Sequence, residues 1–579
     1  MGRSGFPAHS FEILLGAVVG VLGGLAAVGF RWMLAGTEAL FFGGVGGLLE
    51  LIAPYHLLVL PTLGGLIVGP FVWALARGIE GSGVPELQEA AARRGGRLRS
   101  ACWLYKALAS AVTIGSGGSA GREGPIAFIA SSLAADLGRL VRGGEHRRRA
   151  LLACGAAAGV AATFNAPLAG TFFALEIVLG TWTADAFAPV VVAAVAASAI
   201  GRHFFGSHAA FFVYEYSLAT FSELPIFAIL GVAAAVVGIL FIVALYGVGD
   251  LWDRVRMPVA LRLAPAGLAV GALGLLHPAV MGLGYNTVEA TLLGRLTDMR
   301  LLLMLMFGKL IATSLTLGSR GSGGIFAPSL FIGAMLGGAL GQLCHEHIPA
   351  LTTSPGAYAL VGMGALFAAV SHAPLTAVLT IFEITGDYRM ILPLMLACGI
   401  ASVVAQHIYR VSIYNLKLLR RGVHIQLGHD VNLLNDIEIR EAMTAEVMTV
   451  RPHTPARQLL ALSESSGHHG FPLADEHNRL QGLITCDDIQ RATEEGRLDE
   501  PASNLATHRL IVAFPDETLN DALRKLGLHD VGRVPVVSRE DHRRLLGIIT
   551  RKDIVSAYNR ALVQAHTDLE KTAETELFE

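Results

Sequence analysis

Long runs of apolar residues alternate with short polar connections up to about residue 415. Four of these runs, at 11–30, 57–75, 186–201 and 224–248, are long enough to enter or span a bilayer. A membrane-spanning helix needs about 20 mostly apolar residues, because each residue advances the helix by about 1.5 Å. A large soluble protein with buried helices would not repeat such runs so often. The pattern predicts a mainly α-helical membrane protein that crosses the bilayer several times.

The composition of the chain agrees with this prediction. Of the 579 residues, 53% are hydrophobic and 16% are charged, whereas a soluble domain carries about 25% charged residues. The net charge of −2 gives no reason to expect a nucleic-acid partner. Five scattered cysteines form no CxxC pair, so neither a metal site nor a disulfide framework is predicted. The first apolar run is longer than the core of a signal peptide, so we expect it to remain as a membrane segment.

The membrane half of the chain repeats itself at an interval of about 200 residues. Three pairs of segments match in the same order: GSGVPE at 81–86 with GLGYNT at 282–287, GSGGSAGREGPIAFIA at 115–130 with GSRGSGGIFAPSLFIG at 318–333, and APL at 166–168 with APL at 373–375. Each APL is followed by a glutamate nine residues after its proline, Glu176 and Glu383. Transporters built from two such halves often have them inverted in the membrane. We therefore expect inverted structural repeats at about 11–205 and 220–410, within a membrane domain of residues 1–420.

The repeated segments place glycine or proline directly before apolar helical runs. Inside a bilayer, irregular backbone is tolerated only where it is buried in protein or lines an aqueous cavity. A helix that begins there exposes its first N–H groups and the positive end of its dipole, which attract an anion. Ser82 adds a hydroxyl donor, and Glu123 adds a carboxylate that can compete for the same N–H groups and leave when protonated. The alternative is that Glu123 caps its helix or pairs with Arg122.

Three motifs, GSGVPE at 81–86, GREGP at 121–125 and GGIFAP at 323–328, resemble the signature sequences of the ClC family of chloride channels and chloride/proton antiporters. FNAPLAG at 164–170 and IYNLKL at 413–418 also resemble family segments. The resemblance covers essentially the whole membrane domain. It implies that chloride is the transported ion, and that the protein is a homodimer in membrane lipid with one anion pathway per subunit.

The resemblance also implies roles for individual residues. Ser82 and Tyr414 match the hydroxyl donors of a central chloride site, to which Ile325 and Phe326 would add backbone N–H groups. Glu123 matches the external gating glutamate. The other residues expected to line the pathway are Gly83, Lys106, Arg122, Gly124 and Gly324.

One position departs from the pattern of the proton-coupled members. These usually carry a second glutamate in the helix after FNAPLAG as the internal proton acceptor, but alignment from Pro167 puts Glu176 one position early and Ile177 on that position. Isoleucine cannot carry a proton, so we expect a passive chloride channel gated by voltage or pH. The alternative is a chloride/proton antiporter in which water or another group replaces the acid. Ser82 favours chloride over nitrate, because nitrate-selective members tend to have proline there.

The chain turns polar from about residue 416, and basic residues directly after the last apolar run place this tail in the cytoplasm. GLITCDDI at 482–489 matches GIITRKDI at 547–554, and each follows a short strand-like run. The pattern resembles a pair of CBS motifs. The expected boundaries are a module at 430–560 with motifs at about 440–495 and 503–560, and a disordered end at 561–579.

CBS pairs often bind adenine nucleotides, with a threonine on phosphate and an aspartate three residues later on ribose. The matching positions are Thr485, Asp488, Thr550 and Asp553. Threonine and aspartate after a strand also form a helix N-cap, so a module that binds nothing and only supports the dimer is an equal alternative. The resemblance implies no other cofactor.

Two other classes of function fit the sequence less well. An intramembrane enzyme would need a catalytic constellation, and the sequence has no HExxH motif and no serine/lysine or carboxylate pair placed for catalysis. A nucleotide sensor anchored by the membrane half would not need glycine-rich breaks at matched positions in both halves.

Overall fold

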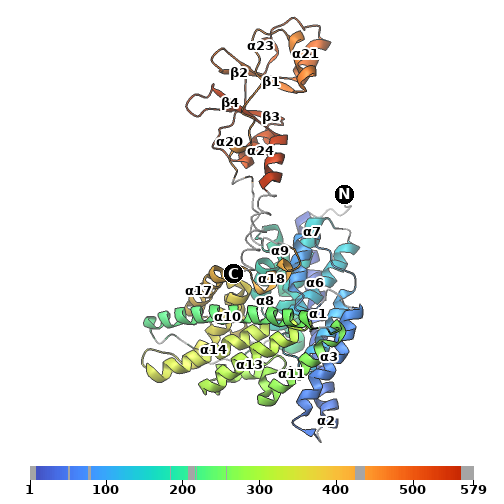
Figure 1. Ribbon diagram of the computed structural model, residues 1–579, viewed down its shortest axis with the longest axis vertical. Coiled ribbons are helices and arrows are strands. Elements are labelled where there is room, and N and C mark those ends of the chain that lie inside the picture. Colours follow the sequence, from blue (N-terminus) through green and yellow to red (C-terminus); the bar gives the residue numbers. More distant parts are fainter. Residues whose placement is uncertain are drawn as a thin grey trace. The chain divides into compact units, whose positions relative to one another are not determined.

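The computed structural model describes residues 8–49, 52–75, 80–141, 143–182, 184–206, 211, 216, 218, 220–255, 257–423, 434 and 437–561. The chain divides into two compact units, Met1–Gly428 and His429–Glu579 (Figure 1). The disorder expected at 561–579 falls, apart from its first residue, outside the described residues.

The first unit consists of helices, many of them short, with η marking 3₁₀ or π segments. Those of its first half are α1 (Ala8–Glu38), η1 (Ala39–Val45), α2 (Gly46–Leu48), α3 (His56–Leu75), α4 (Val84–Ala92), α5 (Cys102–Gly115), α6 (Glu123–Leu140), α7 (Glu145–Phe164), α8 (Pro167–Phe172), η3 (Phe173–Leu179) and α9 (Ala184–Phe205). Those of its second half are η4 (Phe221–Glu223), α10 (Leu224–Arg254), η5 (Val259–Leu261), α11 (Leu263–Leu276), η6 (Pro278–Val280), α12 (Tyr285–Leu292), α13 (Met299–Gly318), α14 (Phe326–His347), α15 (Pro355–Ser371), α16 (Pro374–Thr385), α17 (Ile391–Ile408) and α18 (Ile413–Leu419).

The two halves correspond element by element at the repeated segments. α6 begins at Glu123 and α14 begins at Phe326, which hold equivalent positions in the two motifs. α7 and α15 both end in a residue with φ of 57°, Asn165 and His372, before a proline opens the next helix. The glycines and prolines of the sequence therefore start and stop the same helices in both halves.

The loops that open α6 and α14 pair with each other. Gly121 N donates to Gly324 O at 2.7 Å, and Gly324 N donates to Gly121 O at 2.6 Å, in a short antiparallel bridge. A Cβ atom on Gly324 would lie 2.9 Å from Gly124 N, so a side chain there would separate the two backbones. Because Gly121 and Gly324 are equivalent residues of the two repeats, their mutual pairing indicates an approximate two-fold relation between the halves.

Buried hydroxyl groups continue this seam between the halves. Ser110 Oγ lies 2.9 Å from Ser322 Oγ, and Ser119 Oγ lies 3.0 Å from Thr313 Oγ1. The second pair is the equivalent of the first at an offset of 203 residues, with the two halves exchanged. Hydrogen bonds between small polar residues are a common means of joining helices within a membrane.

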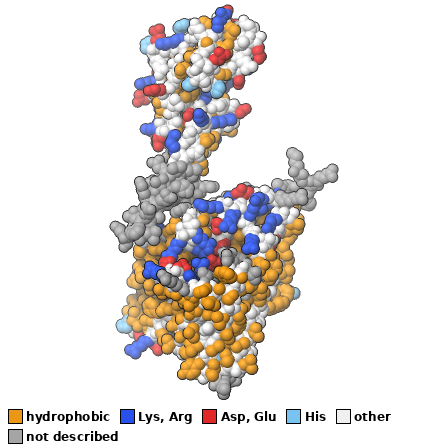
Figure 2. All heavy atoms as spheres, turned by 45° about the vertical axis from the view of Figure 1, so that its right-hand side comes forward, with side chains coloured by type: hydrophobic (Ala, Val, Ile, Leu, Met, Phe, Trp, Pro, Cys, Tyr) orange, Lys and Arg blue, Asp and Glu red, His pale blue; other side chains and the backbone are white. Residues whose placement is uncertain are grey.

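Hydrophobic side chains dominate the surface of the helical unit in the view of Figure 2. Large apolar residues such as Leu140, Phe221 and Leu276 are more than 70% exposed, which a protein surrounded by water would avoid. Within the described residues, seven helices are long and apolar enough to cross a membrane.

The second unit is a small α/β module that also repeats itself. Its elements are α20 (Ile439–Ala442), α21 (Ala456–Ser466), β1 (Gly470–Ala474), β2 (Leu480–Thr485), α22 (Cys486–Glu494), α23 (Ala502–Leu505), α24 (Leu519–Leu528), β3 (Arg533–Val537) and β4 (Leu545–Thr550). β1 pairs antiparallel with β2, and β3 with β4, with the same register and a bulge at the same place. The two repeats meet where Arg479 bridges its own equivalent, Arg544. The predicted fold class, a mainly α-helical polytopic unit followed by an α/β pair, is confirmed.

Candidate anion pathway

Four helix N-termini converge in the first unit and bring the predicted chloride-binding residues together. α4 contacts both α6 and α18, and α6 contacts α14. The side chains that open these helices are buried: Ser82, Glu123, Ile325, Phe326 and Tyr414. The first N–H groups of a helix have no partner within the helix and carry the positive end of its dipole. The arrangement can therefore hold an anion away from water without a full positive charge.

The carboxylate of Glu123 occupies the junction between the two halves. It is fully buried, and its Oε1 accepts a hydrogen bond from the hydroxyl of Tyr285. Its Oε2 has no hydrogen-bond partner among the described residues. A Cβ atom built on Gly121 serves as a reference point for the position of Oε2. This point lies next to Oε2 and 3.0 Å from Ala327 N, which belongs to the first turn of α14. Glu123 thus lies where an anion attracted to α14 would lie.

The alternative ion pair with Arg122 is weak in this geometry. Arg122 Nε and Glu123 Oε1 are 3.9 Å apart, which is beyond hydrogen-bond distance. The strong contact of Glu123 is Tyr285, which the sequence analysis did not single out. Tyr285 lies in GLGYNT, the weakest of the three repeated matches. Its place in a motif equivalent to GSGVPE was the feature of the sequence that could have marked it as a site residue.

The pathway glycines are required by close approaches of backbone and side chain. Gly83 has φ of 84°, and a Cβ on it would lie 2.9 Å from the Phe128 side chain. A Cβ on Gly124 would lie 2.7 Å from Ser82 O. The helix openings predicted from the sequence are therefore packed so closely that only glycine fits at these positions.

Lys106 lies beneath the loop that carries Ser82. Its ammonium group is fully buried and donates to Gly81 O at 2.5 Å. Its equivalent in the second repeat is Lys309, also fully buried, which donates to Gly282 O at 2.7 Å. Lys309 was not among the predicted pathway residues, although its offset of 203 residues from Lys106 matches the repeat.

Glu176 and Glu383 each cap a helix of the opposite half: Glu176 caps α16, and Glu383 caps α8. The carboxylate of Glu176 accepts hydrogen bonds from Leu375 N at 3.3 Å and from Thr376 N at 2.6 Å, at the start of α16. The carboxylate of Glu383 accepts 3.0 and 2.7 Å bonds from the equivalent N–H groups at the start of α8. The glutamate one position before Ile177 is thus engaged with the backbone of the other half.

Ile177 lies in the π-helical segment η3 and is 3% exposed. Its carbonyl oxygen accepts a 2.9 Å hydrogen bond from Gln88 Nε2 of α4. Neither of these two side chains can take up a proton near neutral pH.

Ion pairs fasten α18, which carries Tyr414, to α4, which follows Ser82. Lys417 Nζ lies 2.8 Å from Glu86 Oε1 and donates to Glu80 O at 2.8 Å. Arg421 reaches the same oxygen of Glu86 at 3.2 Å. These ion pairs therefore hold the segment of Ser82 next to that of Tyr414. Glu86 and Lys417 belong to the motifs GSGVPE and IYNLKL, and Arg421 follows the second motif.

In the second unit, the four predicted nucleotide-binding residues form two helix caps. Thr485 Oγ1 donates to Asp488 Oδ2 at 2.7 Å, and Asp488 N donates back to Thr485 Oγ1 at 3.4 Å. Thr550 and Asp553 repeat this arrangement at 2.6 and 3.3 Å. The capping role that the sequence offered as an alternative is present in both repeats.

Comparisons with known proteins agree for both units. The family model described as voltage gated chloride channel matches residues 64–406, and the one described as CBS domain matches residues 438–495 and 502–560. A ClcB-like chloride channel protein of Ralstonia nicotianae is 37% identical over 70% of this chain and 96% of its own. Chloride channel protein CLC-f of Arabidopsis thaliana is 30% identical over 93% of this chain and 79% of its own.

Among solved structures, that of a slow cyanobacterial Cl−/H+ antiporter matches with a TM-score of 0.66 and 29% identity. The match covers 72% of this chain and 99% of that one. The relatives similar in sequence are thus named channels, and this structural neighbour is named an antiporter.

Proposed function

The chain belongs to the voltage-gated chloride channel (ClC) family of integral membrane proteins that transport chloride, and from this membership we propose a passive chloride channel gated by Glu123. The observation that carries the proposal is the buried Glu123 carboxylate at the start of α14. While ionised, it fills the place of the anion. Once protonated, it loses its attraction to the α14 N–H groups and leaves the place to chloride.

The proposed chloride site lies among Ser82, Ile325, Phe326 and Tyr414, with the hydroxyls and backbone N–H groups as donors. The remaining pathway residues, Gly83, Lys106, Arg122, Gly124 and Gly324, shape and bias its surroundings. We place one such pathway in each subunit of a homodimer, with Glu123 opening outward and the CBS pair in the cytoplasm.

The passive mode is supported by the side chains at the internal proton position. Neither Ile177 nor the adjacent Gln88 has a side chain that titrates near neutral pH. The carboxylate of Glu176 is engaged in capping α16. Uphill proton transfer needs a titratable relay between Glu123 and the inner side.

Chloride/proton antiport is the second candidate. Its support is the likeness to a solved structure named as a Cl−/H+ antiporter. In that case water beside Ile177 carries the proton that isoleucine cannot.

Purified protein in liposomes tests both candidates. The proposal expects chloride flux that rises as pH falls, and Glu123→Gln, which mimics the protonated gate, is expected to give fast flux insensitive to pH. A chloride gradient is expected to drive no proton uphill. Stoichiometric proton movement against its gradient would establish the antiporter, and a pH-sensitive Glu123→Gln variant would show that another residue is the gate.

The tail carries a separate proposal, namely that Thr485, Asp488, Thr550 and Asp553 bind an adenine nucleotide. It is supported by the two matches to the CBS domain. A hydroxyl and a carboxylate that cap a helix can still contact a ligand through their remaining lone pairs.

A further inference from the structure

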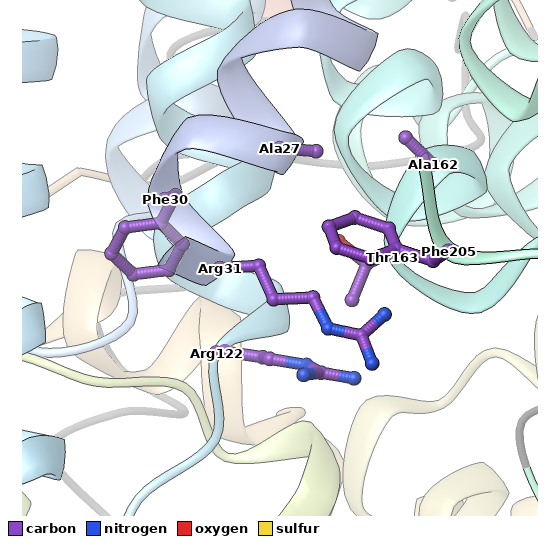
Figure 3. Close-up of a pocket in the computed structure, with 7 residues that line it drawn as sticks. All are labelled: Ala27, Phe30, Arg31, Arg122, Ala162, Thr163 and Phe205. Carbon is purple, nitrogen blue, oxygen red and sulfur yellow. The ribbon is translucent and has the colours of Figure 1, made fainter. Parts of the chain in front are cut away.

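Two arginines meet in one recess, as Figure 3 shows. Glu123 directly follows one of them, Arg122, in the chain. Arg31 comes from α1 and Arg122 from the turn that opens α6, and their guanidinium groups lie side by side. The other lining residues, from α1, α7 and α9, are Ala27, Phe30, Ala162, Thr163 and Phe205. The lining thus combines two cations with mostly apolar walls, and the carboxylate of Glu123 lies 3.9 Å from Arg122 Nε.

The two arginines differ in burial: the Arg122 side chain is 14% exposed, whereas Arg31 is an exposed residue at the edge of the recess. Arg122 Nε is buried without a hydrogen-bond partner among the described residues, since Glu123 Oε1 is 3.9 Å away. The guanidinium carbon of Arg31 lies 4.0 Å from the centre of the Phe205 ring, a contact that uses the face of the cation and leaves its N–H groups at the edge. Two like charges in a partly apolar recess repel each other, and an anion between them would relieve this repulsion.

The recess is small. Its volume of about 10 Å³ is roughly the room of one water molecule. A bulky organic anion does not fit this space without movement of the walls. The positive charge and the small size together favour a small anion.

We propose that this recess is a chloride-binding site at the mouth of the pathway, where Arg31 and Arg122 hold one ion beside the gate. The inference rests on the proposed function. Arg122 is the neighbour of Glu123 in sequence, and its guanidinium carbon lies 5.2 Å from the ring centre of Tyr285, which donates to Glu123. A chloride ion in the recess is therefore close to the Glu123 carboxylate. When the carboxylate leaves the start of α14, the ion can move into the vacated position.

The test measures exchange of radioactive chloride across liposomes that contain the full chain and equal chloride on both sides, with gluconate keeping the ionic strength constant. Arg31→Gln is expected to raise the half-saturating chloride concentration about fivefold, with a maximal rate within about twofold of the original. Fivefold corresponds to about 1 kcal/mol, the size of one charge pair in contact in water.

Two variants serve as controls for charge and position. Arg31→Lys keeps the charge, and is expected to stay within about twofold of the unmodified protein. Arg202→Gln removes a positive charge from the last turn of α9 without lining the recess, and is expected to leave half-saturation unchanged. If Arg31→Gln exchanges chloride with unchanged half-saturation, or if Arg202→Gln has the same effect, the site is refuted.

A second measurement keeps this inference separate from the proposed function. Crystals grown with bromide are expected to show an anomalous peak between the two guanidinium groups, and this peak should vanish in Arg31→Gln. Such a peak would support the site even if the liposomes carried no chloride, an outcome that would overturn the proposed function alone. Unmodified crystals without the peak would overturn the site.

Discussion

A single hydrogen bond between residues of different halves fixes the proposed gate. The Tyr285 hydroxyl donates to Glu123 Oε1, and a hydrogen bond to a charged group contributes about 1.5–3 kcal/mol. This donor holds the carboxylate in the position that the proposed gate takes when it is closed. The residue opposite Glu123 is therefore expected to stabilise the closed form of the proposed gate.

Tyr285→Phe removes this donor and keeps the ring. Because the closed form of the proposed gate loses this hydrogen bond, chloride flux at a fixed pH should rise, by about tenfold or more. The measurement is the chloride flux from liposomes, compared with that of the unmodified protein at the same pH. Tyr358→Phe is the matched control, since the Tyr358 hydroxyl donates to Glu223 at 2.7 Å and not to the gate. An unchanged flux in Tyr285→Phe would mean that the hydroxyl does not stabilise the closed gate.

Ser82→Pro tests the central site. Proline removes both the hydroxyl and the backbone N–H of this position, so the preference for chloride over nitrate should fall. Ser82→Ala removes the hydroxyl alone and should give an intermediate ratio. The measurement is the ratio of chloride to nitrate flux, and a ratio that stays constant in both variants would remove Ser82 from the site.

Residue patterns predicted much of this site and missed its cross-half contacts. Ser82, Glu123 and Phe326 lie at the starts of helices, which nearby glycine and proline residues made predictable. The structure brings these helix starts together. Tyr285 and Arg31 reach the gate only because distant segments pack against it. No local pattern encodes which side chain of one half will face the other.

At the scale of elements, the reciprocal caps of α8 and α16 join the two halves. Each cap satisfies backbone N–H groups in a setting where an unsatisfied group costs about 1–3 kcal/mol. Glu176 and Glu383 are thus expected to act as structural residues.

Glu176→Ala and Glu383→Ala should each lower the free energy of unfolding by about 1–3 kcal/mol, and by similar amounts because the two caps are equivalent. Thermal unfolding of the full chain in detergent measures the loss. Glu346→Ala is the control, because its carboxylate accepts an exposed hydrogen bond from Gln342 of the same helix. If either cap variant were as stable as the control, the cap would contribute nothing.

His508 provides a pH-dependent contact in the second unit. Its ring nitrogens lie 2.9 Å from Gln481 O and 2.8 Å from Ser503 O, so both must donate and the pKa of the ring is raised above 6.5. A raised pKa in the folded state adds stability that is full below pH 6.5 and is lost as pH rises through the folded value.

The loss of melting temperature in His508→Ala should consequently be larger at pH 5.5 than at pH 8.5. The effect is small because the ring is exposed to solvent. A suitable sample is the 430–560 fragment, whose hydrophobic cores lie within it, and the exposed His453→Ala serves as control. An equal loss at both pH values would show that the ring does not bind both carbonyls as a cation.

The starts and ends of helices were predictable where the sequence has a proline or a glycine. Pro167 and Pro374 start equivalent helices, but the first half reaches its terminal glycine, Gly180, one residue later than the second half reaches Gly386. The π-helical segment η3 absorbs this extra residue. Hydrophobic periodicity is too coarse to reveal a single inserted residue inside a continuous apolar run.

At the scale of the whole chain, two independent units have been joined, each with its own core. The repeats of both units were visible in the sequence as constant offsets. The contacts that equivalent residues make with each other were not, because an offset carries no information on how the halves pack.

A nucleotide bound by the second unit should stabilise that unit. If the CBS pair binds ATP, the melting temperature of the 430–560 fragment should rise, with stabilisation of about 2.7 kcal/mol at 100 times the dissociation constant. The double variant Asp488→Asn/Asp553→Asn should lose the rise. Flat profiles with ATP, ADP and AMP would leave the module a supporting role.

The bridge between Gly121 and Gly324 has a consequence for how the pathway became one-sided. A residue that touches its own counterpart is the mark of an isologous interface, the kind that two identical chains form about a two-fold axis. Identical chains would place the same side chain on both sides of that axis, giving two gates or none. Fusion into one chain lifts this requirement. The place of Glu123 is taken in the other half by Phe326, and that of Ser82 by Leu283. The proposed gate can therefore stand on one side alone, because copies linked in one chain are free to diverge while they keep this pairing.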